Sequence, residues 1–152
     1  AEMLANAKQV LVVPGYGMAL AHAQTALGEL AKLCRANNIK FRFGVHPLAG
    51  RMPGQMNVLL TQAGIPYEYV LDMDEVNPDM EANDLVLVIG ANDVINSSAQ
   101  EEEGCAIWGM PVIEAWRGRR VVVCKRTVDG SSYSHLDNPV FYKEHFSVLL
   151  VE

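Results

Sequence analysis

The chain has 152 residues, half of them hydrophobic and with no low-complexity linker between them, so we expect one domain with one buried core over residues 1–152. Its 12 lysines and arginines against 18 aspartates and glutamates give a formal net charge of −6, which opposes binding to a polyanion and excludes nucleic acid as an expected partner. The 3 cysteines lack C-x-x-C spacing and the apolar runs are shorter than the ~20 residues that cross a bilayer, which indicates reduced thiols and a soluble domain.

Short apolar, β-branched runs alternate with helical patterns along the chain, which is typical of a parallel sheet covered by helices on both faces. Strands are expected at residues 9–14, 40–45, 67–71, 84–90, 119–124 and 147–151. Helices are expected at residues 18–36 and 52–63, with shorter helical turns near 74–77, 96–100 and 138–143. Right-handed crossovers then give an α/β, Rossmann-like, doubly wound six-stranded parallel sheet in the order 3-2-1-4-5-6. Ligands bind such a sheet at the carboxyl ends of its strands, which selects the loops 14–18, 45–54, 72–77, 90–96 and 125–138.

The first of these loops, Gly15-Tyr16-Gly17, follows an apolar strand and opens a helix. Glycine has no Cβ, so backbone N–H groups in this turn can approach a pyrophosphate. The turn supplies half of the dinucleotide fingerprint G-x-G-x-x-G/A, whose third small position is occupied by Leu20. By itself it leaves a nucleotide site and a plain strand-to-helix connection equally open.

The loop after the second strand lacks the acid that an ordinary NAD site presents to the ribose. Gly50 and Gly54 instead flank Arg51, and Pro53 stands where a helix begins. This pattern disfavours an NAD-selective site, and a solvated arginine is the alternative to a phosphate contact. His46, at the start of the loop, is a core histidine, a phosphate or ribose donor, or a pH-responsive group.

The loop after the fourth strand, Gly90-Ala91-Asn92-Asp93, places two small residues, an amide and a carboxylate at the switch point of the sheet. This composition suits a ring that packs closely against the backbone. The alternative is that Asp93 and Asn96 cap the short helix that follows.

The loop after the fifth strand begins with Lys125, Arg126 and Thr127. Two adjacent cations and a hydroxyl suit a phosphomonoester, and the small residues that follow suit a lid. A solvated strand end is the alternative. The 4 histidines show no zinc-ligand spacing, so no metal is expected.

Taken together, these loops resemble those of the NADP(H)-binding domain, domain III, of the proton-translocating nicotinamide nucleotide transhydrogenases. The matching motifs are collinear and extend over nearly the whole chain, at Val13–Ala19, Arg42–Gly54, Asn57–Leu60, Met73–Asn77, Leu85–Asp93, Gly109–Val112, Lys125–Arg126 and Asp137–Pro139.

The resemblance implies that NADP(H) lies across the sheet in the orientation opposite to that of an ordinary Rossmann domain, with Lys125 and Arg126 on its 2′-phosphate. It further implies that Tyr16 packs against the nucleotide and that a lid folds over it. From their positions in the loops, we expect the titratable residues Asp93 and His46 to help to communicate a change of state. The implied nucleotide contacts are Gly15, Tyr16, Gly17, Met18, Ala19, Leu48, Ala49, Gly50, Arg51, Met52, Pro53, Gly90, Ala91, Asn92, Asp93, Val94, Gly109, Met110, Lys125, Arg126, Thr127, Gly130, Ser132, Tyr133, Asp137 and Asn138.

As a member of this family the chain would be the soluble part of a larger membrane protein. Hydride would pass directly between NADP(H) and NAD(H) held by a partner, domain I, so the chain alone would be inactive. A proton-conducting membrane domain II would couple proton passage to this site, in a dimeric enzyme with the chain on the cytoplasmic face of the bacterial inner membrane or the mitochondrial matrix face. The alternative is a non-catalytic, NADP-sensing Rossmann module.

Overall fold

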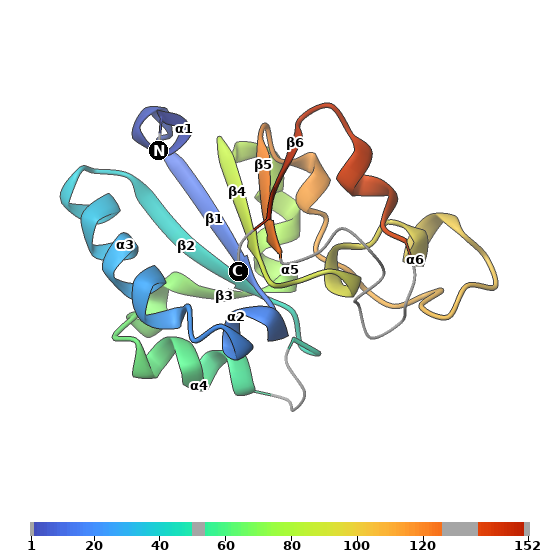
Figure 1. Cartoon of the computed structure of the whole chain (residues 1–152), viewed down its shortest axis with the longest axis horizontal. Coiled ribbons are helices and arrows are strands. Elements are labelled where there is room, and N and C mark those ends of the chain that lie inside the picture. The colour runs from blue at the N-terminus through green and yellow to red at the C-terminus, as the bar shows by residue number, and fades with distance from the viewer. Residues whose placement is uncertain (1, 50–53, 126–136, 151–152) are drawn as a thin grey trace.

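The structure is a computed structural model of the chain that describes residues 2–49, 54–125 and 137–150. Within these residues, six strands form one sheet in the order β3-β2-β1-β4-β5-β6, and every neighbouring pair is parallel (Figure 1). The strands are β1 (Gln9–Pro14), β2 (Lys40–Val45), β3 (Val70–Asp72), β4 (Leu85–Ile89), β5 (Val121–Lys125) and β6 (Phe146–Leu150). The predicted α/β fold class and strand order are therefore confirmed.

The described helices include α-helices and short 3-10 turns. The α-helices are α1 (Glu2–Asn6), α2 (Tyr16–Leu20), α3 (Gln24–Ala36), α4 (Gln55–Gln62), α5 (Met73–Val76) and α6 (Ser98–Glu101). The 3-10 turns are η1 (Tyr67–Tyr69), η2 (Asn77–Ala82), η3 (Asp93–Ile95), η4 (Ala115–Arg117) and η5 (Pro139–Tyr142).

Several of the predicted boundaries differ from the observed ones, and three of these differences bear on the site or have a clear cause. The helix expected at 18–36 is two helices, because the chain turns between α2 and α3 through His22, whose φ is 53°. The strand expected at 67–71 begins only at Val70, because residues 67–69 form the turn η1, in which the Tyr69 N–H donates to the Pro66 carbonyl. The fifth strand runs to Lys125, so this lysine ends a strand rather than beginning a loop.

The two faces of the sheet bury different sets of side chains, which alternate along β1 as a parallel strand requires. Val10 and Val12 join the core under α3 and α4, while Leu11 and Val13 join the core on the other face. Figure 1 shows α2, α3 and α4 gathered on one side of the sheet. The opposite core is covered by α5, η2, η4 and η5. Short helical turns thus cover this face. The elements α5 and η5 lie where the sequence predicted turns near 74–77 and 138–143, whereas η2 and η4 were not predicted.

Candidate functional site

The carboxyl ends of the strands open on one edge of the sheet. Strand register pairs Pro14 with Ile89, the last residues of β1 and β4, and pairs Val45 with Asp72, the last residues of β2 and β3. The predicted site loops therefore follow neighbouring strand ends, where ligands bind in sheets of this type.

A junction of three glycines joins the loops after β1 and β4. The N–H of Gly15 donates to the Ile89 carbonyl at 2.9 Å, and that of Gly17 donates to the Gly90 carbonyl at 3.0 Å. A Cβ on Gly15 would lie 2.4 Å from the Gly90 oxygen, and one on Gly90 would lie 2.3 Å from the Met18 nitrogen. The close approach of two backbone segments thus requires glycine here, independently of any ligand, and two of the turn's N–H groups are already bonded within the protein.

Helix α2 explains why the third fingerprint position tolerates a large residue. In the usual fingerprint this residue is small because the helix packs closely against a strand. Here α2 ends at Leu20, whose side chain is 51% exposed, while Met18 on the other side of the helix is buried. The core contact that the fingerprint assigns to the third position is made by Met18.

The imidazole of His46 is buried, with 2% exposure, and both of its ring nitrogens contact backbone groups. Nδ1 accepts the Leu48 N–H at 3.0 Å, and Nε2 lies 2.6 Å from the Pro111 carbonyl oxygen. The His46 carbonyl also accepts the Ala49 N–H at 2.9 Å, which closes the turn that leaves β2. Burial lowers the pKa of His46, and the bond to the Pro111 carbonyl partly opposes that shift. The ring is therefore buried, as a core histidine would be, and both of its nitrogens are engaged.

A cavity of about 240 Å³ lies beside His46, at the ends of β2 and β3. Its described lining includes the polar side chains of His46, Asn57, Asp72 and Asp74. Ala49 and Gly54, which border the undescribed residues 50–53, also line it.

The loop after β4 is bonded to residues 137 and 138. The Asn138 amide donates to the Asn92 carbonyl and side-chain oxygens, both at 3.1 Å, and the Asn96 amide donates to the Asp137 carbonyl at 3.1 Å. Asn96 also accepts the Ser98 N–H at 2.9 Å, but it lies one residue before Ser97, the N-cap of α6, so it supports the first turn of this helix without being its cap. Asp93 lies instead in η3 and is partly buried.

Lys125, at the end of β5, is buried, and its Nζ lies 4.5 Å from the centroid of the Phe141 ring. An aromatic face attracts a cation at this distance, so Phe141 helps to hold a positive charge at the carboxyl edge. Lys125 ends a strand three places from β2 in the order of the sheet, so β1 and β4 lie between it and the strand that His46 follows.

The predicted residues Gly109 and Met110 lie on the connection between β4 and β5. Gly109 donates its N–H to the Ala99 carbonyl at 2.9 Å, and further along, the Ile113 N–H donates to the Val94 carbonyl at 2.8 Å. These bonds bring the connection against the loop and helix that follow β4.

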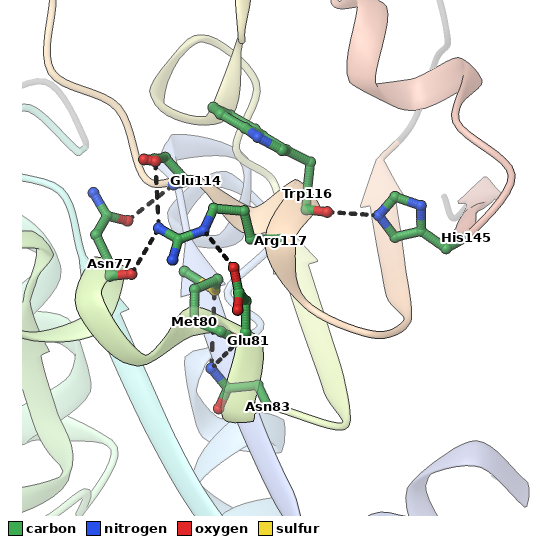
Figure 2. A network of polar contacts seen from close by, with 8 residues as sticks. All are labelled: Asn77, Met80, Glu81, Asn83, Glu114, Trp116, Arg117 and His145. Carbon is green, nitrogen blue, oxygen red and sulfur yellow. Dashed lines mark hydrogen bonds and ion pairs between the residues drawn. The ribbon is translucent and has the colours of Figure 1, made fainter.

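A polar network that the sequence analysis did not predict holds the same connection from the other side (Figure 2). Asn77 donates to the Val112 carbonyl at 3.0 Å and accepts the Glu114 N–H at 2.9 Å. Arg117 donates to the Asn77 carbonyl at 3.0 Å and pairs with Glu81 at 3.4 Å and Glu114 at 3.5 Å. The motif matches at Met73–Asn77 and Gly109–Val112 included Asn77 and Val112, but nothing in the sequence predicted that they bond or pointed to Arg117 and Glu114.

Nine of the predicted contacts lie outside the described residues, and they are Gly50, Arg51, Met52, Pro53, Arg126, Thr127, Gly130, Ser132 and Tyr133. Among residues with described positions, no three His, Cys, Asp or Glu side chains gather closely enough to hold a metal ion. In the same part of the chain, no helix is both long and apolar enough to cross a membrane.

Comparison with known proteins shows which family the chain is similar to. The family model of the NAD(P) transhydrogenase beta subunit matches residues 1–152. Two relatives from Rhodospirillum rubrum, one of them from a named strain and both described as NAD(P) transhydrogenase subunit beta, are each 40% identical to the chain over 147 residues. The match covers 97% of this chain and 32% of each relative, so the chain spans about a third of the length of these curated relatives.

Proposed function

The chain belongs to the NAD(P) transhydrogenase beta subunit family, and from this premise we propose that residues 1–152 are the NADP(H)-binding domain of such a subunit. The predicted nucleotide contacts with described positions follow the carboxyl ends of strands or lie on segments that are hydrogen-bonded to those loops. We take these loops to form one continuous site that binds an extended dinucleotide.

The proposed orientation of the nucleotide rests on the charges at the ends of β2 and β5. An ordinary Rossmann domain binds the adenosine ribose through an acid after the second strand. Here β2 is followed by the buried ring of His46, whose nitrogens are both bonded to backbone. The cation Lys125 ends β5, and Arg126 follows it in the sequence. The 2′-phosphate therefore matches the β5 end, which supports a nucleotide lying in the reversed orientation.

The residues at this edge fit that nucleotide. Lys125 and Arg126 would hold the 2′-phosphate, Tyr16 would pack against the nucleotide, the turn at Leu48 would lead to its phosphates, and Asn138 would close the site. When bound, NADP(H) supplies or accepts a hydride. The chain's own residues bind and orient the nucleotide and do no acid–base chemistry on it.

We extend the proposal to the whole enzyme. Hydride is exchanged with NAD(H) on a separate domain I, and a proton-conducting domain II in the membrane changes the state of this site. The enzyme is a dimer, with this domain on the cytoplasmic face of a bacterial inner membrane or on the mitochondrial matrix face. Coupling needs at least two states that differ in affinity for NADP+ and NADPH, and we assign Asp93 and His46 to the change between them.

Reconstitution with a purified NAD(H)-binding partner domain tests this function. We expect hydride transfer from NADPH to a nicotinamide analogue on the partner, followed by absorbance, only when both proteins are present. Each protein alone is the control, and neither should transfer hydride. Tight NADPH binding without transfer to the partner would instead favour a nucleotide-sensing module.

A further inference from the structure

The segment 111–114 forms neither helix nor strand, and side chains from the β1–β3 half of the molecule supply hydrogen-bond partners to its backbone. Asn77 bonds it at two points, and His46 bonds it at Pro111. The same segment continues directly from Gly109 and Met110. If Gly109 and Met110 move relative to β2, and the segment 111–114 moves with them, the bonds from His46 and Asn77 must break or stretch.

The two contacts of His46 define its protonation. A backbone N–H can only donate and a carbonyl oxygen can only accept. Nδ1 must therefore carry no proton in order to accept from Leu48, and Nε2 must carry the proton that is donated to Pro111. The ring is thus a neutral Nε2–H tautomer that ties the turn after β2 to the segment 111–114.

We propose that neutral His46 is a positioning residue that holds these two loops of the nucleotide site in one arrangement, and that its protonation releases the Leu48 end while keeping the Pro111 end. The second proton would sit on Nδ1 and face the Leu48 N–H, so two donors would oppose each other. The inference rests on the proposed function only in taking these loops to be nucleotide-binding loops.

His46 is the member of this linkage whose bonds can change with pH. Asn77 does not titrate, and Arg117 fixes its backbone while pairing with Glu81 and Glu114 (Figure 2). The ionisable side chains that line the cavity beside His46, among described residues, are Asp72 and Asp74. Because burial lowers the pKa of His46, release is expected only below the ordinary histidine value of 6.5.

Two substitutions separate the two bonds. His46→Asn keeps an acceptor near the Nδ1 position for Leu48 and loses the donor to Pro111, whereas His46→Gln keeps a donor near the Nε2 position and loses the acceptor. We expect nitrogen NMR to show an Nε2–H tautomer in the wild type. We also expect the Leu48 amide, measured by hydrogen exchange relative to its intrinsic rate at each pH, to stay protected in His46→Asn and to lose protection in His46→Gln. Wild-type protein should lose this protection as His46 gains its second proton.

NADPH affinity supplies the functional readout. Each variant should bind NADPH roughly two- to tenfold more weakly at neutral pH, the range expected for one lost hydrogen bond. Wild-type affinity should fall by a similar factor across the titration of His46, and both variants should lack this step. The 2′-phosphate of NADPH titrates in all three proteins, so the difference between wild type and variant at each pH isolates His46. The Asp72→Asn and Asp74→Asn variants should still lose NADPH affinity as His46 is protonated, although the pH of this change can shift.

His145 offers a matched control, because its Nε2 lies 2.7 Å from the Trp116 carbonyl and it precedes β6 at the opposite edge of the sheet. His145→Asn should leave NADPH affinity and its pH step unchanged. An Nδ1–H tautomer, or equal Leu48 protection in wild type and His46→Gln, would overturn the proposal. So would tighter NADPH binding on protonation, which would indicate that His46 contacts phosphate directly. If no NADPH binds, the proposed function fails, while the tautomer and the amide protection still decide whether His46 links the loops.

Discussion

At the scale of single residues, the glycines of the carboxyl edge are explained by contact between chain segments. Gly15 and Gly17 lie against Gly90, and each would place a Cβ less than 3.0 Å from backbone atoms across the junction. The sequence could identify the turn after β1 as special. It could not give this reason, because the residues in contact lie about 75 positions apart in the chain and meet only once β1 and β4 pair.

We predict that Gly90→Ala is among the more damaging small substitutions in the chain. Gly90 has a φ of +67° and its added Cβ would meet the Met18 nitrogen at 2.3 Å, so the left-handed backbone and the overlap both oppose alanine. The expected loss is about 3 kcal/mol or more in the free energy of unfolding, measured by urea denaturation.

Gly104→Ala is the matched control, since Gly104 has a φ of +87° with nothing within 4 Å of the added Cβ. It should lose only the backbone cost of about 1–2 kcal/mol. Equal losses in the two variants would show that the junction is not tightly packed.

At the scale of elements, Asp84 joins the beginnings of β1 and β4. Its carboxylate accepts the Lys8 and Gln9 N–H groups at 2.9 and 3.1 Å. These two bonds lower the pKa of Asp84, and the nearby charges of Arg119 and Lys8 add to the shift, while burial opposes it. The Asp84 side chain thus satisfies two backbone N–H groups at the beginning of β1, a central strand of the sheet.

We predict that Asp84→Asn destabilises the protein at neutral pH by about 1–2 kcal/mol, because an amide oxygen accepts more weakly than a carboxylate. The folded-state pKa of Asp84 lies below the ordinary 3.8, so its stabilisation is complete above that pH and is lost as pH falls through the folded value. The difference between wild type and variant, measured by urea denaturation, should therefore shrink in acid.

Asp79→Asn provides the comparison, because Asp79 pairs with Arg42 at 3.3 Å but its side chain is 47% exposed. An exposed pair of this kind should contribute less than about 1 kcal/mol. A larger loss in Asp79→Asn than in Asp84→Asn at neutral pH would contradict this ranking.

Most of the elements could be predicted from the sequence, and the exceptions have physical causes. Strand β1 is buried on both faces and appears as an apolar run, and β2 alternates Lys40 and Arg42 with the buried Phe41 and Phe43, so both were predicted with their observed bounds. The 3-10 turns that cover the second face are too short to show helical periodicity. The break at His22 interrupts an alanine- and leucine-rich stretch whose composition alone favours one continuous helix.

At the scale of the whole molecule, the order of the strands determined which loops could be found. Once the sheet order was predicted, the strand ends selected the loops that carry His46, Asp93 and Lys125. The bonds that join those loops could not be predicted in the same way, because His46 and Pro111 lie 65 residues apart, and Asn77 and Val112 lie 35 apart. These hydrogen bonds depend on how the segments between strands pack against the sheet, and no local sequence pattern determines that packing.

Selectivity between NADPH and NADH is the property of the whole site that follows most directly from its charge. The proposed function places two cations, Lys125 and Arg126, on the 2′-phosphate that only NADPH carries. Two charge-assisted contacts of roughly 1.5–3 kcal/mol each predict a preference for NADPH of about 10² to 10⁴.

The decisive measurement is a pair of calorimetric titrations of nucleotide-free protein with NADPH and NADH, repeated on the double variant Lys125→Ala/Arg126→Ala. The exposed cations Arg120 and Lys143 lie away from the carboxyl edge, so Arg120→Ala/Lys143→Ala removes the same charge as a control. We predict a strong NADPH preference in the wild type and in the control, and its collapse in the Lys125/Arg126 variant. Equal affinities for the two nucleotides in the wild type would contradict the proposed NADP(H) site.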